Sequence, residues 1–81
     1  MHSVVETDEI ISLRKIWSSL FKVSAPADEQ FALWLFRHGA NVMNAAMAEL
    51  ATKYQKLGGN MDENYMIRFA SSVANRMSRE N

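Results

Sequence analysis

The fold of this chain follows from residues 39–58, GANVMNAAMAELATKYQKLG. Large apolar side chains recur in this stretch at spacings of 4, 3, 4 and 3, and they are Met43, Met47, Leu50, Tyr54 and Leu57. Because an α-helix turns once in about 3.6 residues, this spacing places all five on one helix face. An apolar helix face is stable in water only when another surface covers it, so the chain must bury this face in a helical assembly or against a partner.

Apolar residues on both sides of this stretch follow the same period, and no part of the sequence alternates as a strand does. We therefore expect an all-α fold, a small orthogonal or up-down bundle of four helices at about residues 7–23, 26–38, 41–57 and 62–78. The length of 81 residues, with 48% apolar and 22% charged side chains, fits a single domain over residues 1–81. Residues 1–6 and 79–81 are expected to be flexible ends.

The first and last helices carry recognisable capping residues. Thr7 precedes Asp8 and Glu9, so it is the expected N-cap of the first helix, with both carboxylates near the positive end of the helix dipole. Asn60 or Asp62 is expected to cap the last helix.

The boundary between the second and third helices depends on one glycine. Pro26 is expected to begin the second helix, and Gly39 is expected to end it, with Asn41 as the next N-cap. The alternative is a single helix over residues 26–57, because an interior glycine costs only about 1 kcal/mol relative to alanine. The bundle would then contain three helices.

The composition excludes several kinds of chemistry. Cysteine is absent, which rules out disulfides, thiolate metal sites and cysteine nucleophiles. His2 and His38 lie 36 positions apart, and the carboxylates fall at helix starts, caps or solvent positions, so we expect no enzyme, metal, cofactor or small-molecule substrate. Glu49 and Lys53 are expected to form a surface ion pair within one helix.

The same sequence gives no sign of a membrane location. Its longest apolar run, residues 31–36, is far shorter than the roughly 20 residues of a membrane span, and residues 1–8 lack the pattern of a secretory signal. A cytoplasmic protein that makes no membrane contact is the default expectation.

A protein-binding or adaptor domain is the function that we expect. The second helix has too many large apolar residues for burial on one side, so some of them are expected to contact a protein partner or a second copy of the chain. Aromatic and methionine side chains dominate such contacts, and the candidates are Trp34, Phe36, Met43 and Met47. Core filling is the alternative role, and for the methionines it is the commoner one.

Binding of DNA or RNA is the alternative function. Residues 1–30 carry three basic and five acidic side chains, whereas residues 31–81 carry six basic and four acidic ones, so the second part has a net charge of plus 2. The basic candidates for phosphate contact are Arg37, Lys53, Lys56, Arg68, Arg76 and Arg79. The whole chain has no net charge, so it lacks a strongly basic footprint.

Part of the chain resembles a family of replication proteins. Val42 and Ala45 in an alanine-rich helix, followed by Asn60 and then by Tyr65-Met66-x-x-Phe69, are similar to the C-terminal helical region of DnaD-type replication-initiation proteins. The resemblance covers about half of the chain and implies DNA binding and a role in loading the replicative helicase. The aromatic residue of that pattern late in the last helix is replaced here by residues 75–77, Asn-Arg-Met. We therefore do not assign the chain to the family.

Overall fold

The computed structural model describes residues 7–80, and this part of the chain forms four helices without a strand: α1 (Asp8–Phe21), α2 (Asp28–His38), α3 (Ala40–Lys56) and α4 (Glu63–Glu80). The expected all-α bundle of four helices is confirmed. Each helix begins and ends within two residues of its expected bounds. Residues 79 and 80 continue α4, while residues 1–6 and 81, where flexible ends were also expected, lie outside the described part.

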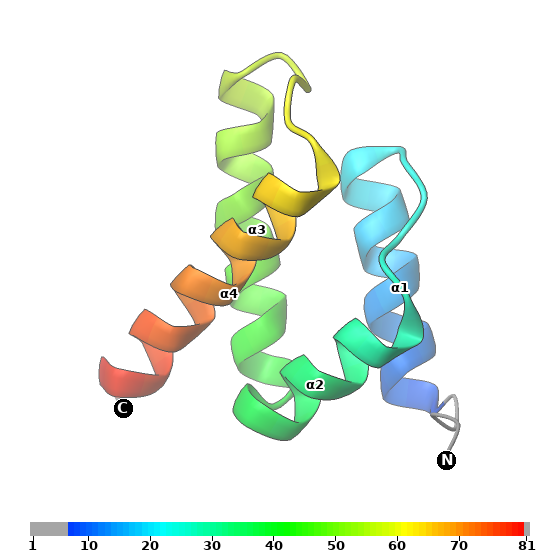
Figure 1. Ribbon diagram of the computed structural model, residues 1–81, viewed down its shortest axis with the longest axis vertical. Helices are drawn as coiled ribbons and strands as arrows, with labels where there is room; N and C mark the ends of the chain where they lie inside the picture. Colours follow the sequence, from blue (N-terminus) through cyan, green and yellow to red (C-terminus); the bar gives the residue numbers. More distant parts are fainter. Residues whose placement is uncertain (1–6, 81) are drawn as a thin grey trace.

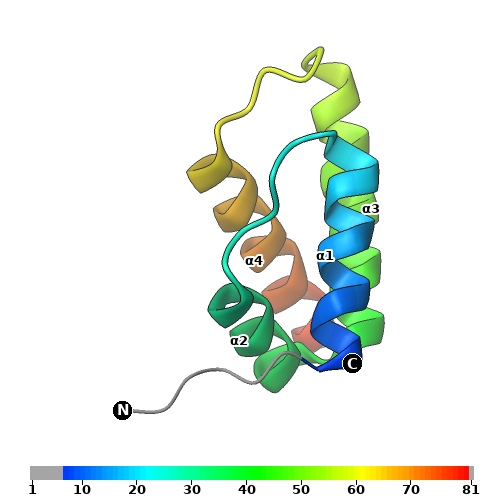
Figure 2. The same cartoon turned by 90° about the vertical axis from the view of Figure 1, so that its right-hand side faces the viewer.

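The four helices pack in two layers. Helices α1 and α3 stand side by side and run in the same direction, while α2 and α4 lie across them (Figure 1). A view from the side separates the α1 and α3 layer from the α2 and α4 layer (Figure 2). Within the described residues α3 and α4 make the most extensive contact, and α1 packs mainly on α2 and α3. The bundle is therefore of the orthogonal kind.

Gly39 separates α2 from α3, as expected. Its φ of 85° and ψ of 164° form a combination that is essentially restricted to glycine. Its N–H donates to the carbonyl of Leu35 at 3.0 Å, and its carbonyl accepts from the N–H of Met43 at 3.2 Å, so this residue ends one helix and begins the next. The expectation that Asn41 caps α3 was therefore wrong, because the chain re-enters the helix at Ala40.

The starts of α1 and α4 follow ordinary capping chemistry, whereas Ala27 before α2 makes no side-chain cap. Thr7 is confirmed as the N-cap of α1, since its hydroxyl accepts from the N–H of Ile10 at 3.2 Å. Asp62 takes the equivalent role before α4, where its carboxylate accepts from the N–H of Tyr65 at 2.9 Å. Helix α2 begins at Asp28, two residues after the expected start at Pro26.

The core is apolar and draws on all four helices. None of the buried residues in the described part is polar or charged. The buried side chains are Ile10, Leu13, Trp17, Phe21, Phe31, Trp34, Met43, Ala46, Met47, Leu50, Met66, Ala70, Val73 and Ala74. The two tryptophans stack at the centre, with 6.0 Å between ring centroids and 26° between ring planes.

Two hydrogen bonds from aromatic side chains connect the helices around this core. The indole N–H of Trp34 in α2 donates to the hydroxyl of Ser71 in α4 at 2.9 Å. The hydroxyl of Tyr54 in α3 donates to the carbonyl of Phe21 at the end of α1 at 3.1 Å, and their rings lie 5.0 Å apart. Both bonds satisfy polar groups that packing would otherwise leave without water.

Candidate functional site

Three of the four residues expected at a protein interface belong to the core. Trp34 is 2% exposed, and Met43 and Met47 are 0% exposed. The crossing of α2 and α4 over α1 and α3 covers the face on which these side chains lie, so in this fold they offer no surface to a partner. The structure thus corrects their assignment and agrees with the alternative that the two methionines fill the core.

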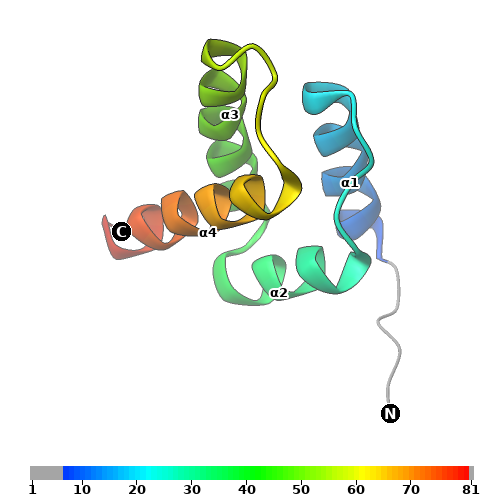
Figure 3. The same cartoon turned by 45° about the horizontal axis from the view of Figure 1, so that its top comes forward.

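The fourth candidate, Phe36, lies on the surface. Its side chain is 89% exposed, and Leu33, one turn before it, is 43% exposed. Glu29 and Arg37 are also exposed and share the same side of the helix by their spacing. We call Glu29, Leu33, Phe36 and Arg37 the outer face of α2. This helix runs along an edge of the molecule with no other helix beyond it (Figure 3).

The charges of the outer face are available for external contacts. Within residues 7–80, the carboxylate of Glu29 and the guanidinium of Arg37 take part in no ion pair or hydrogen bond. The neighbouring carboxylate of Asp28 differs, because it accepts from the guanidinium of Arg14 in α1 at 3.0 Å. The outer face therefore combines two apolar side chains with one unpaired charge of each sign.

A second candidate surface lies between α3 and α4. A hollow of about 590 Å³ lies along the surface where these two helices meet. It is lined by Glu49, Thr52, Lys53, Lys56, Phe69, Ser72, Val73 and Arg76. We call these residues the α3–α4 groove. Of the six basic residues expected to contact nucleic acid, the fold brings three, Lys53, Lys56 and Arg76, to this groove.

One of those three cations is engaged by carboxylates. The guanidinium of Arg76 donates to both carboxylate oxygens of Glu49, at 2.7 and 3.0 Å, and lies 3.6 Å from the carboxylate of Glu80. The hydrogen bonds to Glu49, followed by the charge of that carboxylate, raise the pKa of Arg76 above its ordinary value. Glu49 therefore pairs with Arg76 across the groove, which corrects the expected pair with Lys53 within α3.

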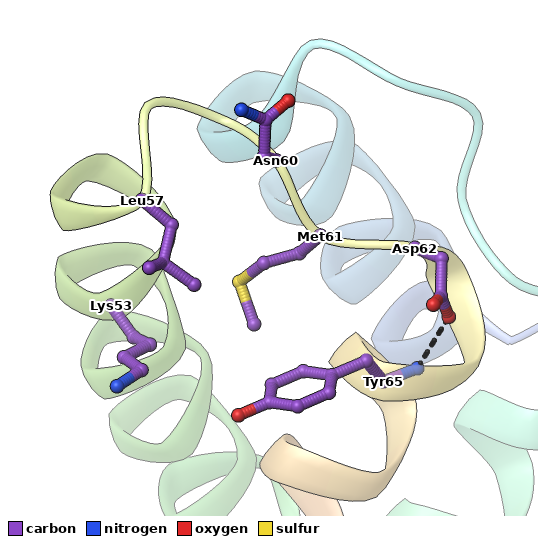
Figure 4. Close-up of a pocket in the computed structure, with 6 residues that line it drawn as sticks. All are labelled: Lys53, Leu57, Asn60, Met61, Asp62 and Tyr65. Carbon is purple, nitrogen blue, oxygen red and sulfur yellow. Dashed lines mark hydrogen bonds between the residues drawn. The ribbon is translucent and has the colours of Figure 1, made fainter.

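The groove continues into a smaller apolar hollow at the end of α3. This hollow of about 280 Å³ is lined by Lys53, Leu57, Asn60, Met61, Asp62 and Tyr65. Met61 and Tyr65 extend across it toward α3, while the side chain of Asn60 points outward (Figure 4). The ring of Tyr65 stacks on that of Phe69, with 6.4 Å between centroids, and Arg68 borders the same two rings. A pair of stacked aromatic rings thus lies beside two cations, Lys53 and Arg68, and the helical spacing in the sequence did not indicate this grouping.

The remaining sequence candidates lie elsewhere. Arg37 belongs to the outer face of α2, and Arg79 lies in the last turn of α4. His38 lies in the last turn of α2, and its Nδ1 is 2.8 Å from the hydroxyl of Ser78, an exposed contact that links α2 to α4. No group of three potential metal ligands occurs among residues 7–80.

None of the four helices is long and apolar enough to cross a membrane, within the part of the chain that the structure describes. Comparison with known proteins finds no matching family model, no matching curated protein and no matching solved structure. The similarity of residues 42–69 to DnaD-type proteins thus remains a resemblance of sequence pattern.

Proposed function

We propose that this chain is a noncatalytic interaction domain that binds a protein through the outer face of α2. The observation that carries the proposal is the exposure of Phe36, whose ring is 89% exposed. Among residues 7–80 the other exposed large apolar side chains are only 40–46% exposed: they are Leu20, Val23, Leu33, Leu57 and Tyr65. A phenyl ring gains about 1.5–3 kcal/mol when it is fully buried, so Phe36 can supply binding free energy that folding leaves unused.

The composition of the outer face supports a protein partner. An aromatic ring beside an aliphatic side chain, with charges at the margin, is the usual make-up of the centre and rim of a protein interface. The flanking Glu29 and Arg37 carry opposite charges, so this face has no net attraction for a polyanion. We therefore place protein binding, rather than nucleic-acid binding, at α2.

Site-specific photocrosslinking tests this proposal. A benzophenone amino acid at position 36 should give covalent adducts with a protein in cells that naturally express the chain. The matched control places the same group at Gln55, an exposed polar residue of α3, where few adducts are expected. Equal crosslinking at the two positions would contradict the proposal.

A second function, binding of single-stranded DNA or RNA, is supported by the α3–α4 groove. Lys53 and Lys56 lie at its wall and can contact phosphates, while the stacked rings of Tyr65 and Phe69 offer a surface for bases. Against it stand the zero net charge and the pairing of Arg76 with Glu49.

Fluorescence anisotropy with a labelled oligonucleotide tests the second function. Affinity should fall steeply with salt and should drop after Lys53→Ala or Lys56→Ala. Lys15→Ala, which removes an exposed cation from α1, is the matched control and should change little. Absence of binding at low salt would exclude this function.

A further inference from the structure

We infer that the partner of the outer face of α2 is a second copy of this chain, packed as an antiparallel α2 pair about a two-fold axis at Leu33. This inference rests on the proposed function, because it requires the same face to be a protein interface. It goes further by naming the partner, the orientation and the residues that meet.

The spacing of the charged residues carries the inference. Glu29 lies four residues before Leu33 and Arg37 lies four residues after it, which is about 6 Å along the helix axis on either side. A two-fold axis that passes between the two Leu33 side chains, perpendicular to both helices, therefore places each Glu29 at the same height as the Arg37 of the other copy, and the long arginine side chain can reach across to it. The interface then contains two ion pairs that are equivalent by symmetry.

The same symmetry brings the apolar residues together at the centre. Leu33 of each copy meets Leu33 of the other, and each Phe36 ring covers the aliphatic stem of the other copy's Glu29, which lies on the same flank of the face and at nearly the same height. Burial of these two rings supplies the main favourable term, since ion pairs at an interface rim contribute little affinity. The charges instead select the orientation.

A parallel pair is disfavoured by the same residues. Parallel packing about this face would bring Glu29 toward Glu29 and Arg37 toward Arg37, so like charges would repel at both ends. The antiparallel pair also places the positive end of one helix dipole beside the negative end of the other. Charge complementarity thus favours a second copy in one defined orientation.

The length of α2 limits the interface area, and therefore the affinity, of such a dimer. A helix of 11 residues is about 16 Å long, so the contact lies at the low end of specific interface sizes. We therefore expect a weak, reversible dimer whose population rises with protein concentration.

Sedimentation equilibrium with charge variants tests the inference. In Glu29→Arg alone, positions 29 and 37 are both positive, and in Arg37→Glu alone both are negative. Like charges then meet in each homodimer, so each variant should dimerise with a Kd about tenfold higher than that of the native chain. An equimolar mixture of the two restores both ion pairs, and it should form a heterodimer at least as strong as the native homodimer. The double variant Glu29→Arg/Arg37→Glu should also dimerise. Circular dichroism of each variant checks that the fold is unchanged.

The outcomes separate this inference from the proposed function. A native chain that stays monomeric at millimolar concentration would overturn the dimer, as would a mixture no stronger than its components. Adducts from position 36 to a different protein, without any to a second copy, would overturn the dimer and leave the proposed function standing. Absence of adducts from position 36 to any protein would instead overturn the proposed function, and the dimer with it.

Discussion

Replacement of Ser71 by alanine tests how much the hydrogen bond of a buried indole N–H contributes to stability. The hydroxyl of Ser71 accepts from the indole N–H of Trp34 at 2.9 Å, and Trp34 is only 2% exposed. Ser71→Ala leaves this donor without its partner, whereas alanine itself is well tolerated in a helix interior. We therefore expect a loss of stability caused by the unpaired donor alone.

The expected loss is about 1–2 kcal/mol. A buried donor left unpaired costs about 1–3 kcal/mol, and Ser71 is half-buried, so water reaches part of the vacated space and lowers the cost. A loss of 1 kcal/mol corresponds to a melting temperature about 4–8 °C lower in a domain of this size. Trp17, whose indole N–H has no partner in the described part of the chain, shows that this core tolerates one such group.

Urea unfolding followed by circular dichroism measures the free energy of unfolding of four proteins: the native chain, Ser71→Ala, Trp34→Phe and the double variant. Phenylalanine removes the indole donor, so Ser71→Ala should cost no more than a few tenths of a kcal/mol when position 34 carries phenylalanine. If Ser71→Ala costs the same in both backgrounds, the hydrogen bond does not stabilise the fold and the reasoning fails.

Three further outcomes are expected from equilibrium unfolding. Met47→Ala should lower the free energy of unfolding by about 2–5 kcal/mol, because Met47 is fully buried and leaves a cavity; a loss under 1 kcal/mol would contradict its place in the core. Gly39→Ala should lower the free energy of unfolding by about 1–3 kcal/mol, because an L-residue is strained at a φ of 85°. The added methyl group meets no atom within 4 Å, so a steric clash does not contribute. D-alanine at this position, introduced by chemical synthesis, should therefore recover most of the lost stability. Phe36→Ser should leave stability within about 0.5 kcal/mol of the native value, as expected for an exposed residue, and a larger loss would mean that the ring packs within the monomer.

Helical periodicity was sufficient to predict the four helices, because each has an apolar stripe of the right width and a residue that ends or caps it. Gly39 was the boundary for which the sequence left two alternatives. A glycine inside an apolar pattern is compatible with both a break and a continuous helix, and only the backbone angles at that residue distinguish the two. The expected cap at Asn41 failed for the same reason, since a residue that ends one helix rarely also begins the next.

The buried and exposed residues of α2 were harder to tell apart, because residues 31–36 are apolar on every side of the helix. Trp34 and Phe36 are two positions apart and so point to nearly opposite sides of α2. This spacing alone excludes an interface that contains both side chains. It could also have indicated that one of the two is buried and the other exposed. The equal spacing of Glu29 and Arg37 on either side of Leu33 indicates a symmetric contact only when it is known that all three residues lie on the exposed side of α2.

The ion pair between Glu49 and Arg76 could not be predicted from the sequence, for a different reason. These residues are 27 positions apart, and their contact depends on how α3 and α4 cross. Local spacing instead pointed to Lys53, which lies one turn from Glu49 on the same helix. Long-range ion pairs are set by tertiary packing, so a pattern within one helix cannot indicate them.

The stacked tryptophans make the centre of this molecule optically distinctive. The chain has only two indoles, and both lie within the core with 6.0 Å between their ring centroids. At this separation their electronic transitions couple, so the pair should add an exciton signal to the far-ultraviolet circular dichroism that disappears on unfolding. Tryptophan emission, excited selectively, then reports on the interior alone. In Phe36→Trp a third indole would lie in water, and its emission would shift to the blue when a second surface covers it.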